Sequence, residues 1–436
     1  MPRDNQKNSM EKEISRIENE EERLKNIIQG NLSQYLGGRN PFTMNTKEER
    51  EQLRGYMIEI VSGMSEPTFL RRFQLEDFYD RLIMDLTSLG VLSELLEDDS
   101  VSEIMVNGYD DIWVERNGRT EKTDIAFRNE EELFDMGVRI ARNVGRNLDM
   151  RNTMVDARLP DMSRVNIITS PNYLGDTAIT IRKFNKKRLT IDDLIEGNTL
   201  NEEIADFLKA AVISKANILV SGGTNTGKTT NLNILSNFIP KEERVITIED
   251  SAELQLTGDH ILSLETTEAN AEGEGEVTMT DLLKNTLRMN PSRIIVGEVR
   301  DHTAYDLLNS MNTGHDGAMS TVHANSPNDC VIRLNNMISE RGYNFSLETV
   351  YAMIGAGVDL IIQLYEQGGQ RYISEISQVY LGKDRTLEMD TLFRFEIDKI
   401  NENGRVTGEF VKANVKLNQD MLLKFRRRNI NPEDYF

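Results

Sequence analysis

The sequence predicts a chain of the α/β class, in which a C-terminal α/β domain follows an α+β domain and an N-terminal helical arm or bundle. In the second half of the chain, apolar strand-like runs alternate with helical patterns, which is typical of parallel strands covered by helices. These runs lie at 217–220, 245–248, 293–296 and 319–322. Between residues 102 and 184 the strands are instead short and alternate apolar with polar residues, which indicates an antiparallel sheet.

Length and charge narrow the classes of protein that the chain can represent. Its 436 residues exceed one ordinary core and predict two or three domains of roughly 100 to 200 residues each. Hydrophobic residues make up 38% and charged residues 28%, as in soluble globular proteins. A net charge of -21 disfavours a broad nucleic-acid surface, because such binding depends on clustered Lys and Arg.

Features of secreted and membrane-spanning chains are missing from the sequence. Residues 1–10 contain no apolar run that would act as a signal peptide, and no stretch of about 18 apolar residues follows. The single cysteine, Cys330, cannot form an internal disulfide, which fits a reducing compartment. We expect it to be a small buried residue on a helix. The sequence therefore predicts a cytoplasmic protein.

The first predicted elements are helices. From residue 11 to 36, apolar residues recur at near-helical spacing within a segment dense in charge, which indicates an amphipathic helix. Two further helical stretches follow, at about 46–61 and 75–89. Residues 1–90 are therefore predicted to form the helical arm or bundle.

The α+β domain is predicted over residues 91–184. Its first two strands alternate apolar and polar residues, and the second ends at the turn Asn117-Gly118. One helix, at about 130–144, interrupts the strands. The predicted strands are 103–107, 111–115, 155–159, 164–169 and 178–184.

The remaining boundaries follow from composition. Residues 185–201 are polar and are predicted to be a linker. The C-terminal α/β domain then covers 202–412, and a tail covers 413–436.

The strongest chemical signal is the segment NILVSGGTNTGKTT at 217–230. It contains the spacing of Gly222, Gly227, Lys228 and Thr229 that defines a phosphate-binding loop, or P-loop. A strand precedes the glycines and a helix-compatible run follows, so backbone amides can hold phosphate at a helix N-terminus. The alternative is a chance Gly-rich turn between a strand and a helix. The predicted nucleotide-binding residues are Gly222, Gly223, Thr224, Asn225, Thr226, Gly227, Lys228, Thr229 and Thr230.

The same loop predicts ATP and Mg²⁺ as ligands. Lys228 would neutralise the β- and γ-phosphates, and the Thr229 hydroxyl would bind Mg²⁺. ATP is favoured over GTP because no Asn-Lys-x-Asp segment is present to recognise guanine.

Hydrolysis also requires a carboxylate near the γ-phosphate, and the sequence offers two. Glu249 ends the strand VITIE and Glu298 follows RIIVG, so both acids are expected at the carboxyl edge of one sheet. Each alone is equally compatible with a solvated acid at a strand end. Gly297 stands where many P-loop enzymes have Asp, so the metal ligand is not simply assigned there.

Two of the four histidines, His315 and His323, lie in the short segment GHDGAMSTVHAN. An imidazole here would hydrogen-bond a γ-phosphate or the acidic edge of the sheet. Each histidine by itself is more typical of a structural role.

Four blocks in order resemble the secretion and pilus ATPases of the type II/type IV secretion superfamily. They are SGGTNTGKTT at 221–230, ITIEDSAELQL at 246–256, RIIVGEVRD at 293–301 and MNTGHDGAMSTVHANSP at 311–327. They look like the Walker A, acidic box, atypical Walker B and His box of that superfamily. The resemblance extends over about 86–396 and is greatest to the CpaF-type ATPases of Tad (Flp) pilus systems.

The resemblance implies specific roles and domain folds. Glu298 would polarise the attacking water, Glu249 would assist at the metal and γ-phosphate, and His323 would sense that phosphate. The C-terminal domain would be RecA-like and the α+β domain PAS-like. Three arginines of the α+β domain would act as fingers or phosphate contacts between subunits, although surface salt bridges are the plainer alternative. They are Arg158, Arg164 and Arg182.

The resemblance also implies a hexameric ATP-driven motor for Tad pilus assembly or type II-like secretion. The ring would work in the cytoplasm through an inner-membrane platform protein, and the N-terminal domain would swing on residues 185–201. Met162 departs from the family pattern, which usually has Gly in this turn.

Three competing functions stay open at this point. The first is a related ATPase of a conjugative or type IV secretion system, which would share fold and chemistry. The second is a nucleic-acid motor, which the acidic charge disfavours. The third is a nucleotide-gated scaffold that does not hydrolyse ATP, which the two glutamates disfavour.

Overall fold

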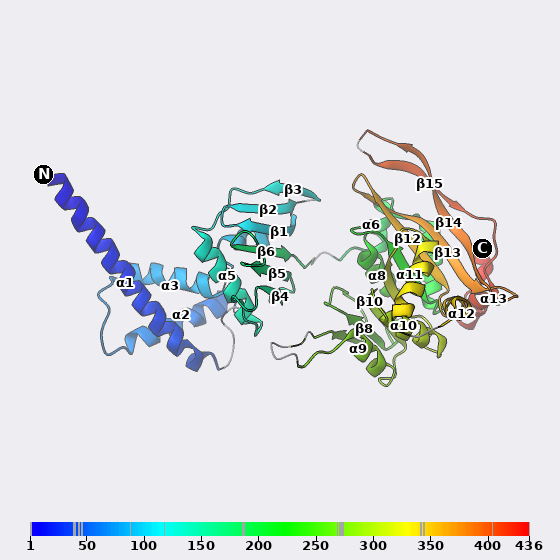
Figure 1. The fold of residues 1–436 in the computed structure, drawn as a ribbon, viewed down its shortest axis with the longest axis horizontal. Coiled ribbons are helices and arrows are strands. Elements are labelled where there is room, and N and C mark those ends of the chain that lie inside the picture. Colours follow the sequence, from blue (N-terminus) through cyan, green and yellow to red (C-terminus); the bar gives the residue numbers. More distant parts are fainter. Residues whose placement is uncertain are drawn as a thin grey trace. The chain divides into compact units, whose positions relative to one another are not determined.

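The computed structural model describes two units, residues 1–186 and 187–436, which are shown in Figure 1. Described residues are all except 1, 38–40, 42, 43, 45, 46, 88, 117, 185–187, 268, 270–273, 341, 343, 344, 403 and 436. Among the described helices, none combines the length and the apolar character needed to cross a membrane.

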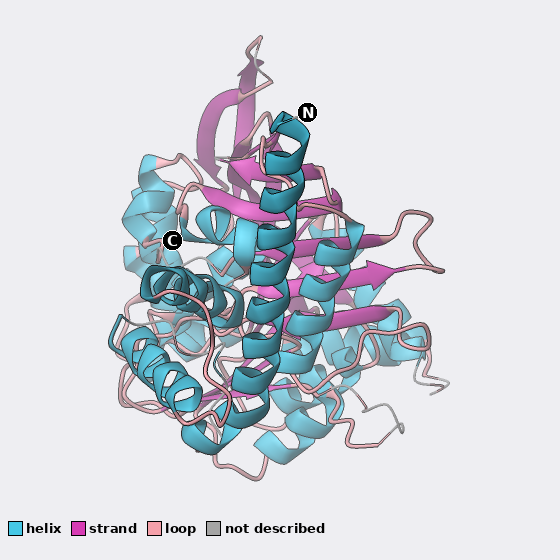
Figure 2. Cartoon of the chain, turned by 90° about the vertical axis from the view of Figure 1, so that its left-hand side faces the viewer, coloured by secondary structure: helices cyan, strands magenta, loops and turns pink. Residues whose placement is uncertain are grey.

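Three helices begin the first unit: α1 (Pro2–Leu36), α2 (Lys47–Ser62) and α3 (Arg72–Thr87). The long α1 stands out in Figure 2. Leu24, Ile28 and Leu32 lie on one stripe of α1 and are buried against α2 and α3. Their spacing of four residues places them on one face of the helix, so the rest of α1 can remain charged.

The second part of the first unit is a six-stranded antiparallel sheet, as the alternating pattern predicts. Its strand order is β3-β2-β1-β6-β5-β4. One face packs on α5 (Glu130–Asn143), which begins at Asn129, whose side chain accepts a hydrogen bond from the Glu132 amide. Two short helices, η2 (Gly90–Leu92) and α4 (Ser93–Glu97), precede the sheet. The strands are β1 (Val101–Gly108), β2 (Asp111–Arg116), β3 (Arg119–Lys122), β4 (Met154–Arg158), β5 (Arg164–Thr169) and β6 (Thr177–Arg182).

The turn between β4 and β5 keeps a glycine-like shape without a glycine. Met162 has φ of +74°, and its amide donates to the Leu159 carbonyl at 2.9 Å. Met162 therefore adopts the left-handed region that Gly adopts most readily, although a side chain crowds the backbone there.

The second unit has a nine-stranded sheet of order β15-β14-β13-β12-β7-β11-β10-β8-β9. The strands from β12 to β9 in that order run parallel, which confirms the prediction for the second half of the chain. They are β7 (Ile218–Gly222), β8 (Val245–Glu249), β9 (Ile261–Glu265), β10 (Arg293–Val299), β11 (Met319–His323) and β12 (Leu360–Gln367). An antiparallel extension that the sequence did not predict follows: β13 (Gln370–Leu381), β14 (Leu387–Ile400) and β15 (Val406–Lys412).

Helices cover both faces of this sheet, as Figure 1 shows. Ile218 and Val220 of β7 point into one core with α7 (Glu202–Ile213) and α8 (Lys228–Ser236), whereas Leu219 points into the other. Burial on both faces explains why the strand is apolar throughout instead of alternating. The second core contains α9 (Met279–Thr286), α10 (Thr303–Asn312), α11 (Pro327–Glu340) and α12 (Leu347–Gly357). Cys330 is fully buried on α11, as predicted.

Most of the segment predicted as a linker belongs to the second unit instead. Helix α6 (Ile191–Glu196) begins with a capping box between Thr190 and Asp193. Leu194 and Leu200 are buried in the core shared with α7. The polar composition of 185–201 concealed these apolar anchors, and residues 185–187 lie outside the described residues.

The predicted tail also packs on the second unit. Helix α13 (Gln419–Arg427) buries Phe425 against Phe207, with ring centroids 6.3 Å apart. Lys424 pairs with Asp359 at 2.5 Å and with Asp316 at 3.0 Å, which holds α13 near the start of β12. The tail ends in the short helix η3 (Pro432–Asp434).

Replacing Met162 by Gly should stabilise the first unit. Relief of left-handed strain, roughly 1–2 kcal/mol, exceeds the extra chain entropy of Gly, roughly 0.5–1 kcal/mol, so the net gain should be about 0.5–1 kcal/mol. Urea unfolding measures the change. Met150→Gly, at an exposed position without positive φ, is the control and should give no gain. A loss of stability in Met162→Gly would contradict the strain argument.

Candidate functional site

The predicted P-loop joins β7 to α8 in the second unit. Gly227 is the N-cap of α8 with φ of +88°, and Asn225 has φ of +60°. A Cβ on Gly222 would lie 2.4 Å from the Thr226 hydroxyl and 3.1 Å from the Leu364 carbonyl oxygen. Glycine is therefore required at 222 for close packing and favoured at 227 for its backbone conformation. The resulting loop presents amides at the start of a helix, as phosphate binding requires.

Lys228 lies folded over this loop. Its Nζ donates to the Gly223 carbonyl at 2.6 Å. Burial lowers the pKa of Lys228, and the nearby Glu298 carboxylate opposes that shift. An ammonium whose described hydrogen bond goes to the Gly223 carbonyl and not to a carboxylate fits a site for polyanionic phosphate.

Glu249 ends β8 as a deeply buried acid. It is 3% exposed, and its Oε1 accepts hydrogen bonds from the amides of Glu253 at 2.9 Å and Leu254 at 3.1 Å. These two bonds close the turn that follows the strand. Glu249 is therefore fixed by its own loop, which suits a residue that positions other groups.

The Glu249 side chain leaves no room for a side chain at residue 297. The parallel register of β8 and β10 pairs Ile248 with Val296, so the next residues, Glu249 and Gly297, are neighbours. A Cβ at 297 would lie 3.0 Å from Glu249 Cγ and 3.5 Å from its Oε1. The acid of β8 thus fills the space that a side chain at 297 would occupy, which accounts for the atypical Gly before Glu298.

Glu298 lies at the same edge of the sheet and pairs with an arginine that the sequence analysis missed. Arg300 donates from Nη2 to Glu298 Oε2 at 2.7 Å, and its Nη1 is 3.8 Å from Asp250 Oδ2. The carboxylate is partly exposed, so it can reach solvent. Arg300 was detectable in the sequence, because it lies two residues beyond the acid.

The two histidines of the His box are separated by β11. His315 precedes that strand, whereas His323 is its last residue, and parallel pairing places His323 opposite Gly222. The Nδ1–H of His323 donates to the Gly222 carbonyl at 3.2 Å. Burial, followed by the charge of Lys228, lowers the pKa of His323, so the neutral ring leaves Nε2 as an acceptor.

Metal binding would rest on few protein ligands. Thr229 lies in the first turn of α8 and Glu249 at the end of β8, as predicted. Within the described parts of the chain, no group of three His, Cys, Asp or Glu side chains has the arrangement of a protein-only metal site. The Thr229 hydroxyl and the Glu249 carboxylate are oxygen ligands of the kind that Mg²⁺ uses together with nucleotide phosphates.

The three arginines of the first unit form a row. Arg158 lies opposite Arg164, and Arg164 opposite Arg182, in the registers of β4, β5 and β6. Directly opposed residues share one face of a sheet, and here it is the face away from α5, because their strand neighbours are buried in the core. Like charges directly opposed repel one another, and an anion bound beside them would reduce that repulsion. Glu103 of β1 lies opposite Arg182, at the end of the row.

Arg371 is a second residue that the sequence analysis missed. It lies at the start of β13, and its guanidinium contacts the P-loop at Asn225. The two residues are 146 positions apart, so no sequence spacing signals the contact.

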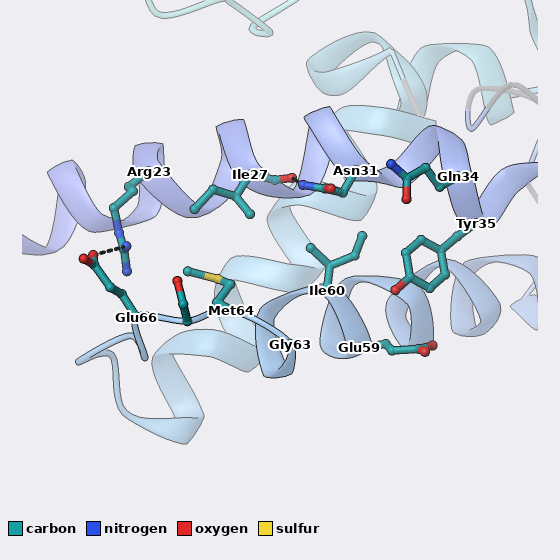
Figure 3. Close-up of a pocket in the computed structure, with 11 residues that line it drawn as sticks. Arg23, Ile27, Asn31, Gln34, Tyr35, Glu59, Ile60, Gly63, Met64 and Glu66 are labelled. Atoms are coloured by element: carbon teal, nitrogen blue, oxygen red, sulfur yellow. Dashed lines mark hydrogen bonds and ion pairs between the residues drawn. The ribbon is translucent and has the colours of Figure 1, made fainter.

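A cavity in the first unit is not part of this site. It has a volume of about 520 Å³ and lies between α1 and the end of α2, with Arg23 pointing at Glu66 across its mouth (Figure 3). Arg23 also pairs with Glu20 at 2.9 Å. Arg23 is thus paired with two acids of the same unit.

Comparison with known proteins identifies the family of the chain. Residues 85–384 match the family described as "Type II/IV secretion system protein". The chain belongs to this family. The resemblance predicted from the four sequence blocks is thereby confirmed, and this secretion-family member is an ATP-hydrolysing enzyme.

Relatives of the secretion ATPase differ in how much they share with it. An uncharacterized protein of Methanocaldococcus jannaschii is 46% identical over 241 residues, covering 53% of this chain and 33% of that protein. A putative conjugal transfer protein of Mycobacterium tuberculosis is 30% identical over 300 residues, covering 67% and 85%. Protein VirB11 of Agrobacterium fabrum is 29% identical over 332 residues, covering 70% and 95%.

Two solved structures, one of a secretion-system ATPase and one of a pilus motor, are similar to this secretion ATPase. The VirB11 ATPase of the Brucella suis type IV secretion system is 29% identical and covers 66% of this chain and 93% of its own, with a TM-score of 0.37. The pilus retraction motor PilT is 19% identical and covers 78% and 86%, with a TM-score of 0.49.

Gly297→Ala should disturb the secretion ATPase through Glu249. The added methyl group must displace a carboxylate held by two amides, and shifts of this kind slow catalysis by tenfold or more, on the order of the losses seen for misplaced groups. Steady-state phosphate release measures the effect. Gly55→Ala is the control, because a Cβ there meets nothing within 4 Å. Unchanged turnover in Gly297→Ala would contradict the role of this contact.

Proposed function

We propose that this chain is the ATP-hydrolysing motor subunit of a conjugative or type IV-like secretion system. The supporting observation is the meeting of the P-loop with Glu249, Glu298 and His323 at one edge of the sheet. Relatives named as conjugal transfer and VirB11 proteins favour this choice over the Tad pilus role that the sequence first suggested. Tad pilus assembly, like the CpaF-type assignment, stays a prediction.

The P-loop would bind the triphosphate of ATP. The phosphate oxygens would accept hydrogen bonds from the loop amides and from the Lys228 ammonium. The ammonium would then give up the bond that it now makes to the Gly223 carbonyl. Thr229 and Glu249 would hold Mg²⁺, which supplies positive charge to the phosphate oxygens. Because Glu249 is fixed by two amides, it is suited to orient its neighbours.

Glu298 would act on the attacking water. A carboxylate at the sheet edge can accept the proton of a water molecule that attacks the γ-phosphate. Its ion pair with Arg300 must loosen for this, since a carboxylate bonded to a guanidinium is a weaker base. His323, neutral and presenting Nε2, would accept a hydrogen bond from that water or gain a proton once the charged phosphate arrives.

The arginine row would supply charge from another subunit. Three guanidinium groups on one face of the sheet can stabilise charge that develops on a transferring phosphoryl group. The direct register of the three arginines in β4, β5 and β6 supports this use. A homo-hexameric ring that works through a membrane platform protein is the assembly in which such contacts would occur, and the swinging of a PAS-like domain belongs to the same proposal.

Glu298→Gln tests the catalytic role. The amide keeps the shape of the acid but cannot take a proton, so turnover should fall by about 100-fold or more, while ATP binding is retained. Phosphate release and binding of a fluorescent ATP analogue separate the two effects. Lys228→Ala should lose binding, and Glu340→Gln, on the exposed end of α11, should match the wild type. Wild-type turnover in Glu298→Gln would move the catalytic role elsewhere.

Mixing two inactive variants tests whether Arg182 acts between subunits. Arg182→Ala and Glu298→Gln each inactivate a site, but a mixed ring pairs an intact Glu298 with an intact Arg182 in about one quarter of its sites. ATPase activity should therefore reappear on mixing. Activity that stays at the level of the separate variants would contradict a finger in trans.

A further inference from the structure

The Arg371 guanidinium donates two hydrogen bonds to Asn225 of the P-loop. Its Nε donates to the Asn225 backbone carbonyl at 2.9 Å, and its Nη2 donates to the Asn225 side-chain oxygen at 2.7 Å. Its Cδ lies 3.4 Å from the position of a Cβ on Gly227. The guanidinium therefore binds one residue through two oxygens, which fixes both the backbone and the side chain of that residue.

Asn225 is the point at which the loop needs such support. Its φ of +60° is left-handed, a region that non-glycine residues adopt only when the surroundings hold them there. Gly227, two residues later, is left-handed as well. The amides between these residues must point inward for phosphate to bind, so the conformation at 225 controls the shape of the cradle.

The backbone of Arg371 is itself held in place. Its carbonyl accepts a hydrogen bond from the Thr199 hydroxyl at 3.1 Å, and the Ile373 amide donates to the Thr199 carbonyl at 2.8 Å. Thr199 is buried, and its amide closes the end of α6 on the Leu194 carbonyl at 2.8 Å. The guanidinium thus extends from a fixed point, as a preorganised second layer around a site requires.

The side chain of Arg371 has little part in the core. It is exposed, and neither hydrophobic core of the second unit includes it. The neighbouring acid, Glu366, accepts instead from the Gly369 amide at 2.7 Å. The described contacts of the guanidinium therefore serve the loop and not the fold.

We propose that Arg371 is a positioning residue of the nucleotide site, which holds the P-loop in its phosphate-binding shape through Asn225. The inference rests on the proposed ATPase function and deepens it. Arg371 acts on the affinity for phosphate groups, because it shapes the loop that binds them, and leaves the chemical step to Glu298.

Arg371→Ala is the direct test. Loss of two charge-assisted hydrogen bonds should weaken ADP binding and raise the KM for ATP by roughly tenfold, while kcat stays within about twofold. A fluorescent ADP analogue and steady-state kinetics measure these quantities. Arg371→Lys has one point charge in place of the planar guanidinium, so its ADP affinity and KM for ATP should lie between those of the wild type and those of Arg371→Ala. Arg394→Ala, which removes an exposed arginine paired with Glu396 on β14, is the matched control and should behave as the wild type.

A second variant separates action through Asn225 from direct contact with the nucleotide. Asn225→Gly keeps the left-handed backbone but removes the side-chain oxygen, so Arg371→Ala should cost clearly less in this background. An equal cost in both backgrounds, or unchanged ADP binding in Arg371→Ala, would overturn the proposal.

Failure of the proposed function would look different. In that case the wild type and Arg394→Ala would also release no phosphate from ATP. A wild type that hydrolyses ATP, together with an unaffected Arg371→Ala, would contradict the Arg371 inference alone.

Discussion

The parallel register of four strands is the constraint on which the nucleotide site depends. β7, β11, β10 and β8 are adjacent in the sheet, and their carboxyl ends finish at one edge. Gly222 pairs with His323, and Glu249 falls beside Gly297, because backbone hydrogen bonds set these registers. A shift of one residue in any of these strands would turn its functional side chain to the opposite face. The apolar residues buried on both faces of the sheet prevent that shift.

At this edge, side chains pack so closely that a side chain at one position requires glycine at its neighbour. Glu249 occupies the volume in front of Gly297, and the Thr226 hydroxyl occupies the volume in front of Gly222. These two positions therefore need glycine because neighbouring side chains leave no room for a Cβ, and not only because glycine has a flexible backbone. The acid at this position therefore comes from Glu249 of β8 and not from residue 297 of β10, and it lies at the same edge of the sheet.

Charged side chains gather in two groups, one on each sheet. Three arginines are directly opposed on one sheet, and Arg300 lies between Glu298 and Asp250 at the edge of the other. Like charges repel one another in the arginine row, whereas opposite charges attract one another in the group around Arg300. Arg371 is also exposed, and its guanidinium donates hydrogen bonds to Asn225, a loop residue with a left-handed backbone. Sites that break local rules in this way are typical of functional surfaces.

The sequence by itself determined the parallel strands of the second half, the P-loop, the two glutamates and the family, because each is a short-range pattern of spacing and residue type. Only the tertiary structure decided the rest. It placed α6 and α13 on the second unit, separated His315 from His323, and showed why residue 297 is Gly. It also brought Arg371 to Asn225 across 146 positions and aligned Arg158, Arg164 and Arg182 in one row. These contacts join residues distant in the chain, and their partners are set by strand order and register, which local propensity does not encode.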